Sequence, residues 1–169
     1  VESVTFPENA SGNRNMAGLS LAESWSNLET VVDKGLARTL GVCNVSLSQL
    51  RTILDEGSII PAIVQVERHP YQPRTDLVQF CHDRGIRIIA HSPLSAPGLL
   101  AEPVLNDIAT DREWSPAQVV LAWNVTQGVV PIPSSTDPAH IVSNLAASGL
   151  ELDATERRRI ERLEDPAFQ

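Results

Sequence analysis

The chain alternates short apolar runs with longer segments that carry helix signals, and this alternation constrains its fold more than any other feature. The runs occupy residues 37–43, 62–66, 86–90 and 129–132. Three of the four are nearly continuous in apolar residues, which is typical of strands covered on both faces. Strand, helix and strand at this spacing predict parallel pairing through right-handed crossovers. The predicted fold class is therefore α/β.

Most segments between the runs begin with a capping pattern. In a capping box, the first side chain accepts from a backbone N–H three residues on, and the Glu or Gln there reaches back. Such pairs are Ser20 with Glu23, Ser46 with Gln49, Ser115 with Gln118 and Asp153 with Glu156. Asp137 before Pro138 predicts another helix start, and apolar periodicity predicts helices over 76–84, 103–110 and 118–127.

Polar side chains stand at the carboxyl end of each apolar run. Asn44 follows the first run, Gln65 and Glu67 end the second, His91 and Ser92 follow the third, and Ser134, Ser135 and Thr136 follow the fourth. Ligands of parallel α/β proteins bind at the carboxyl ends of the strands. No GxGxxG phosphate loop follows any run, so a barrel-like layout is favoured over a Rossmann fold. The sequence also lacks HExxH and paired CxxC motifs, and we expect no metal site.

Composition excludes several classes of function. The net charge of −8 disfavours sequence-independent binding to nucleic acid or to an anionic membrane, so we expect neither as a partner. No apolar run approaches the roughly 18 residues that would span a bilayer. Cys43 and Cys81 are the two cysteines and make no disulfide framework, which predicts a cytoplasmic protein. The chain begins at Val1 rather than Met, so we expect a processed protein or a fragment.

Five segments resemble motifs of one enzyme family, the aldo-keto reductases, in the order and spacing of that family. The segments are 35–44, similar to GxxRxxGVSNF; 65–71, similar to NQVExHPY; 80–94, similar to FCxxxGIxxxAYSPLG; 115–123, similar to SPAQVxLRW; and 132–144, similar to IPKSxxxxRIxxN. Together they cover about residues 21–165.

The resemblance implies part of a TIM (β/α)8 barrel that reduces aldehydes and ketones to alcohols with NADP or NAD as cofactor. A barrel of this kind takes about 250 residues, and the match corresponds to strands five to eight with their helices. Residues 1–19 are then the loop that follows strand four, and residues 20–169 the C-terminal half of the barrel. The catalytic Asp, Tyr, Lys and His of the family lie in the other half, so we expect no catalytic residue in this chain. Tyr71 belongs to a turn and is not the proton donor.

The resemblance also implies a cofactor site. Cys43, Asn44 and Gln65 would bind the nicotinamide carboxamide, and His91 replaces a tyrosine that stacks on the ring. Ser92 and Leu94 would line the pyrophosphate groove, Ser134, Ser135, Thr136 and His140 would lie near the adenosine phosphate, and Asn144 near the adenine. We expect Asn44, Gln65, His91 and Ser135 to converge on one hollow.

Each of these residues also has a purely structural interpretation. Gln65 could be a buried amide, Asn44 an Asx turn, His91 a hydrogen-bonded histidine at the barrel mouth, and Asn144 a solvated helix residue. His69 and His82 are expected to be structural.

The segment 132–144 differs from the family motif at two positions where the family has cationic side chains. Ser134 and His140 replace the Lys and Arg that bind the 2′-phosphate of NADPH. A charge-assisted hydrogen bond contributes about 1.5–3 kcal/mol, so we expect weaker selection for NADPH. Asp137 would repel a 2′-phosphate but can accept from a 2′-hydroxyl.

Three functions remain open from the sequence. The first is the cofactor-binding half of a reductase, which needs the N-terminal half of the same protein as its partner and is inactive alone. Its substrate would be a small carbonyl compound. The second is a catalytically incompetent relative that acts as a nucleotide-binding or interaction module. The third is a barrel hydrolase or isomerase with Glu67 and either His69 or His91 as base.

Overall fold

A computed structural model describes residues 18–165 and 168, and most of the loop predicted at 1–19 lies outside them. The predicted alternation is confirmed. The strands are β1 (Gly41–Cys43), β2 (Ile63–Glu67), β3 (Arg87–His91) and β4 (Val130–Ile132). The helices are α1 (Leu21–Asp33), α2 (Leu47–Glu56), α3 (Thr75–His82), α4 (Pro103–Arg112), α5 (Pro116–Thr126), α6 (Pro138–Ala146) and α7 (Ala154–Glu161), with short 3₁₀ turns at Leu99–Ala101 and Ala147–Gly149.

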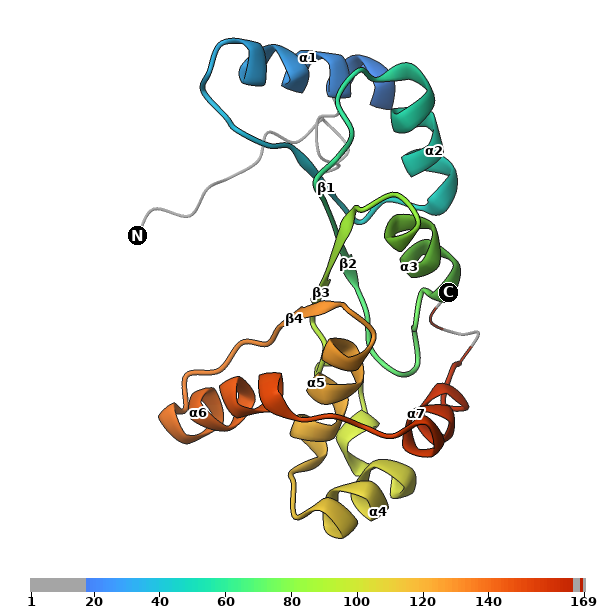
Figure 1. Ribbon diagram of the computed structural model, residues 1–169, viewed down its shortest axis with the longest axis vertical. Helices are drawn as coiled ribbons and strands as arrows, with labels where there is room; N and C mark the ends of the chain where they lie inside the picture. Colours follow the sequence, from blue (N-terminus) through green and yellow to red (C-terminus); the bar gives the residue numbers. More distant parts are fainter. Residues whose placement is uncertain (1–17, 166–167, 169) are drawn as a thin grey trace, which may run out of the picture.

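The four strands form one parallel sheet in the order β1-β2-β3-β4 (Figure 1). Each strand is added beside the one before it, whereas a doubly wound sheet reverses its order at a switch point. Cys43 is aligned with Gln65, and Glu67 with His91, so these side chains share one face of the sheet. The order confirms a barrel-like layout and gives four of the eight strands of a closed barrel.

Helices α2 and α3 cover one face of this sheet. Val64 and Val66 of β2 are buried there together with Ile88 and Ala90 of β3, against Leu50 of α2 and Leu77, Val78 and Cys81 of α3. On the opposite face Val130 and Ile132 are 40% and 44% exposed. The expectation of strands covered on both faces is therefore wrong for this structure. Nothing among the described residues packs over the second face, which becomes the filled interior only when eight strands close.

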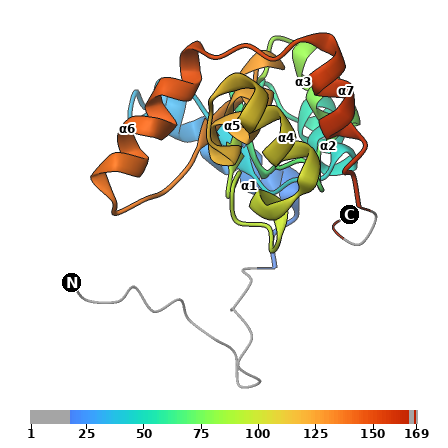
Figure 2. The ribbon, with the colours of Figure 1, turned by 90° about the horizontal axis from the view of Figure 1, so that it is seen from below.

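The remaining helices lie at the two edges of the sheet, α1 on the β1 side and α4 to α7 on the β4 side (Figure 1). Trp25 of α1 is buried with Ile53 of α2, and its indole nitrogen donates to the Ile59 carbonyl at 3.1 Å. Helices α4, α5 and α7 share a second core, in which Trp123 and Ile160 are fully buried. Seen from below, α6 lies on the flank away from α3 and α7 (Figure 2). No helix of the described part of the chain is long and apolar enough to span a membrane.

A buried arginine joins the loop after β2 to α5. Arg68 is 1% exposed, and its guanidinium lies 3.9 Å above the Trp123 ring. It donates to the Pro73 carbonyl at 2.9 Å, to Asn124 Oδ1 at 2.5 Å and to Gln127 Oε1 at 2.9 Å. Burial lowers the pKa of Arg68 to about 9, so the side chain stays charged near neutral pH. The three hydrogen bonds to neutral oxygens hold the segment that follows β2 against the end of α5.

Candidate functional site

Cys43 and Asn44, at the carboxyl end of β1, lie beside Gln65 in the middle of β2. Cys43 is exposed and its thiol donates to Gln65 Oε1 at 3.7 Å. The Asn44 backbone N–H donates to the Gln65 carbonyl at 2.8 Å, which continues the parallel ladder by one residue. Gln65 is half-buried. Its amide nitrogen has no partner among the described residues, so this edge keeps a polar donor for a ligand.

The side chain of His91, at the end of β3, reaches across to Asn44, and both of its ring nitrogens are hydrogen-bonded. Its Nε2 lies 2.7 Å from Asn44 Oδ1, and its Nδ1 lies 3.0 Å from the Ser92 hydroxyl. The side-chain oxygen of Asn44 is thus hydrogen-bonded to a residue of β3. In an Asx turn, it would instead accept from the backbone of the residues that follow it. The structural alternative for His91, a hydrogen-bonded histidine at the mouth, describes this arrangement.

The carboxylate of Glu67 lies on the same face and pairs with a buried histidine. Glu67 Oε1 is 3.3 Å from Nε2 of His69, whose side chain has no solvent exposure. Burial lowers the pKa of His69, and the hydrogen bond and charge of Glu67 oppose that shift only in part. His69 is consequently a buried neutral partner, in line with the structural role expected of it.

A cavity of 340 Å³ holds most of the predicted residues of the phosphate and adenine end. Leu94, Ser134, Ser135, His140 and Asn144 line it together with Leu100, Ser115, Pro116, Ala117 and Ser143. Thr136 is exposed and does not line this cavity. Sequence reasoning missed the contributions of Leu100 and Ser143. Neither carries a motif signal, because only tertiary packing brings the start of α5 against α6.

Asp137 shapes the loop at this end. Its Oδ1 accepts from the Ala139 N–H at 2.8 Å and caps α6, while its own N–H donates to the Ser135 hydroxyl at 3.1 Å. Its second carboxylate oxygen lies 3.9 Å from His140 Nδ1. A negative charge therefore stands at the N-terminus of α6, between Ser134 and His140, the two positions where the family pattern has cations.

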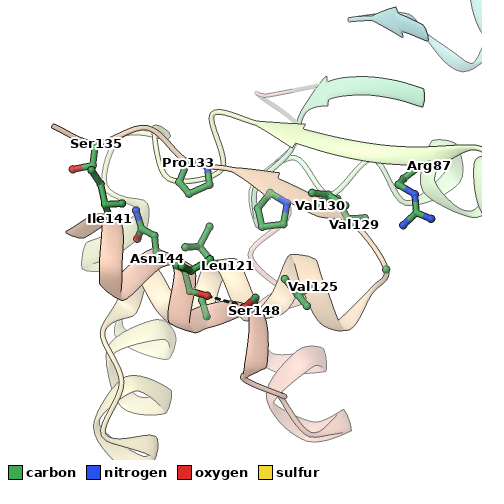
Figure 3. A pocket seen from close by; sticks show the side chains of 14 residues that line it. Arg87, Leu121, Val125, Val129, Val130, Pro133, Ser135, Ile141, Asn144 and Ser148 are labelled. Carbon is green, nitrogen blue, oxygen red and sulfur yellow. Dashed lines mark hydrogen bonds between the residues drawn. The ribbon is translucent and has the colours of Figure 1, made fainter. Parts of the chain in front are cut away.

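A larger cavity of 540 Å³ lies between β4, α5 and α6 (Figure 3). Its walls are mainly apolar and include Leu121, Val125 and Ile141, with Ser135 and Asn144 at one end and Arg87 at the other. Apolar walls of this kind suit packing against another part of a barrel better than binding a phosphate. Neither of these two cavities of the described residues is the single hollow expected for Asn44, Gln65, His91 and Ser135. Ser135 lines cavities that Asn44, Gln65 and His91 do not line, because the open sheet leaves the mouth without its other wall.

Tyr71 lies away from this edge, beside α4 and the end of the chain. Its hydroxyl donates to Glu102 Oε1 at 2.6 Å, and its ring stacks on Phe168 at 5.4 Å. Burial raises the pKa of Tyr71 to about 12, which suits a structural hydroxyl. In residues 18–165 and 168 no three His, Cys, Asp or Glu side chains gather closely enough to hold a metal ion.

Comparison with known proteins decides the family. The family model described as "Aldo/keto reductase family" matches residues 5–165. The chain belongs to the aldo-keto reductase family. "Aldo-keto reductase family 1 member A1" of Mus musculus is 35% identical over 168 residues, which are 94% of this chain and 52% of the mouse protein. "Aldo/keto reductase slr0942" of Synechocystis is 38% identical, over 95% of this chain and 53% of that protein.

Solved aldo-keto reductases share the fold. The aldose reductase from Schistosoma japonicum superposes with a TM-score of 0.86 at 27% identity, over 95% of this chain and 53% of that one. A Gox0644 mutant in complex with NADPH gives a TM-score of 0.81 at 29% identity, over 88% of this chain and 55% of the other. The chain spans about half the length of the relatives it matches.

Proposed function

We propose that this chain is the cofactor-binding half of an NAD(P)H-dependent aldo-keto reductase that reduces small aldehydes or ketones to alcohols. Residues 20–169 would supply strands five to eight of the barrel. The observation that carries the proposal is the gathering of Asn44, Gln65 and His91 at one carboxyl edge of the sheet. Support also comes from a relative's name, the probable NAD(P)H-dependent D-xylose reductase xyl1 of Emericella nidulans, and from the Gox0644 complex with NADPH.

The residues at this edge fit the nicotinamide end of the cofactor. A carboxamide needs a donor and an acceptor, and an Asn or Gln amide supplies both. Among the described residues, Asn44 Nδ2 and Gln65 Nε2 are without partners, so both can donate to the cofactor. Cys43 is a weaker partner than a serine would be, since its thiol is a weak donor. The bound cofactor would supply hydride, while this chain orients it.

The loop after β4 would bind the phosphate and adenosine end. Ser134, Ser135 and Thr136 offer hydroxyls and the N-terminus of α6 offers backbone N–H groups to a phosphate. Ser92 and Leu94 would border the pyrophosphate, and Asn144 and His140 would lie beside the adenosine. With Asp137 fixed at this helix start, NADH would be accepted more readily than in relatives with two cations.

Proton donation would come from outside this chain. We expect the family's catalytic Asp, Tyr, Lys and His to lie in the N-terminal half of the same protein, which would supply them and complete the substrate pocket. The chain alone would bind cofactor and reduce nothing.

Calorimetric titration of the chain with NADPH and NADH tests the proposal. We expect saturable binding that the Gln65→Ala variant weakens about 3- to 10-fold, because one hydrogen bond contributes about 0.5–1.5 kcal/mol. Gln79→Ala, on the exposed surface of α3, is the matched control and should bind as the wild type does. No heat of binding for either cofactor, or equal weakening by both substitutions, would refute the proposed site.

A further inference from the structure

The His91–Asn44 hydrogen bond spans two strand spacings. Asn44 follows β1 and His91 ends β3, with β2 between them in the sheet. Neighbouring strands lie about 4.8 Å apart, so the two side chains bridge about 10 Å over the carboxyl end of β2. The 2.7 Å contact is thus the link between an edge strand and the third strand at the mouth.

The backbone on both sides of this link is strained. Asn44 has φ 54° and Ser92 has φ 51°, both in the left-handed region. Such conformations cost about 1–3 kcal/mol for a residue with a side chain and persist only where the surroundings hold them. Asn adopts this region more readily than most residues, but Ser92 has no such advantage. The imidazole of His91 is hydrogen-bonded to both of these residues, so it is part of the surroundings that hold them in place.

We propose that His91 is a positioning residue, which acts on the cofactor by fixing the orientation of the Asn44 amide. In the neutral Nε2–H tautomer, His91 donates to Asn44 Oδ1 and accepts from the Ser92 hydroxyl at Nδ1. The Asn44 carbonyl oxygen then accepts from His91, and its Nδ2 group, which has no partner among the described residues, is the donor left for a ligand. The ligand group that this donor recognises is a carbonyl oxygen, which under the proposed function is that of the nicotinamide carboxamide.

This assignment separates His91 from a simple stacking role. A stacked ring needs its face, and a phenylalanine would replace it. A positioning ring needs its edge nitrogens, and phenylalanine cannot replace those. Loss of the link would let the Asn44 amide rotate, so the nicotinamide end would bind more weakly and the adenosine end would be unaffected.

Four single variants, one double variant and two ligands test the proposal by titration of the full chain. The ligands are NADPH and 2′-phospho-ADP-ribose, which lacks the nicotinamide. We expect His91→Phe to raise the Kd for NADPH about 5- to 10-fold and to leave that for 2′-phospho-ADP-ribose unchanged. His91→Gln keeps a donor and should stay within about 3-fold of the wild type. His82→Phe, on the exposed end of α3, is the control.

Asn44→Ala should match His91→Phe, and the double variant should be no weaker than either alone, because both remove one unit. Additive losses, or equal losses for the two ligands, would overturn the positioning role. If the wild type binds neither ligand, the proposed function and the nicotinamide assignment both fail. The link itself is judged separately by ¹⁵N NMR of the His91 ring. The Nε2–H tautomer would support it, and the Nδ1–H tautomer or a freely rotating ring would refute it.

Discussion

At the scale of single residues, Ser134 and His140 decide how the chain would select between cofactors. Both line the 340 Å³ cavity at the start of α6. Ser134→Lys combined with His140→Arg should lower the Kd for NADPH at least about 10-fold, since each charge-assisted hydrogen bond contributes about 1.5–3 kcal/mol. Affinity for NADH should change little. Paired titrations measure both, and an equal gain for the two cofactors would show that the cations do not meet the 2′-phosphate.

Glu156 links stability to pH. Arg112 binds both of its carboxylate oxygens, at 2.7 and 2.8 Å, and this hydrogen bonding holds the pKa of Glu156 below its usual 4.5. A carboxyl with a lowered folded-state pKa stabilises the fold above its unfolded pKa, and this stabilisation is lost as pH falls through the folded value. Glu156→Gln should therefore cost about 1–2 kcal/mol at pH 7, and this cost should shrink as the pH falls below 4.5 and through the lowered folded-state pKa.

Urea unfolding of the wild type and the Glu156→Gln variant, at pH 7 and below pH 4.5, measures this cost in the free energy of unfolding. Glu151→Gln, on an exposed glutamate of the preceding loop, is the control and should cost almost nothing. A Glu156→Gln penalty that is the same at both pH values would mean that the Arg112 pair does not depend on the charge of Glu156.

At the scale of elements, the packing of α1 on α2 depends on a glycine. A Cβ added to Gly57 would lie 2.6 Å from the Ile53 carbonyl oxygen and 2.6 Å from Cδ1 of the buried Trp25. Since neither backbone nor a packed indole can yield easily, Gly57→Ala should destabilise the fold by about 1–3 kcal/mol. Gly149→Ala meets nothing within 4 Å and should be near neutral. Equal midpoints of urea unfolding for the two variants would contradict this packing.

The elements were largely predictable because their signals are local. The capping boxes at Ser20, Ser46, Ser115 and Asp153 all form and begin helices. The apolar run at 37–43 overestimates the length of its strand, since only its last three residues form β1 and pair with β2. Apolar composition alone predicts burial on both faces of the sheet, whereas the uncovered face follows only from the resemblance to half of a barrel.

The site was predictable only in part, for a similar reason. Motif positions placed Cys43, Asn44 and Gln65 at one edge, and parallel register brings them together. The hydrogen bond between Asn44 and His91 depends on two left-handed turns that no sequence pattern indicated. The shared hollow failed because it needs a complete ring of strands.

At the scale of the whole molecule, two sheet edges and one face lack partners among the described residues. On the β4 side, Ile141, Val142 and Leu145 of α6 are 51%, 69% and 74% exposed, and near β1 Leu36 and Ile60 are 76% and 63% exposed. Unpaired edges beside apolar side chains favour association. We expect size-exclusion chromatography with light scattering to show dimers or larger species of the chain.

Val142→Glu with Leu145→Lys should shift the chain towards monomer, because both replace exposed apolar groups of α6. Arg158→Glu, at an exposed position of α7, is the control for altered surface charge and should leave the association unchanged. A wild-type monomer with a sharp thermal transition would contradict the incomplete-barrel account.

Hydrogen–deuterium exchange with and without saturating NADPH tests the central claim most directly, since it reports on every segment and tolerates self-association. The account predicts slower exchange in two separate groups, residues 43–46 with 65–67 and 91–95, and residues 132–144. Helices α1 and α4 should exchange as before. Protection confined to other segments, or no change at all, would contradict the assignment of the strand ends as a cofactor site.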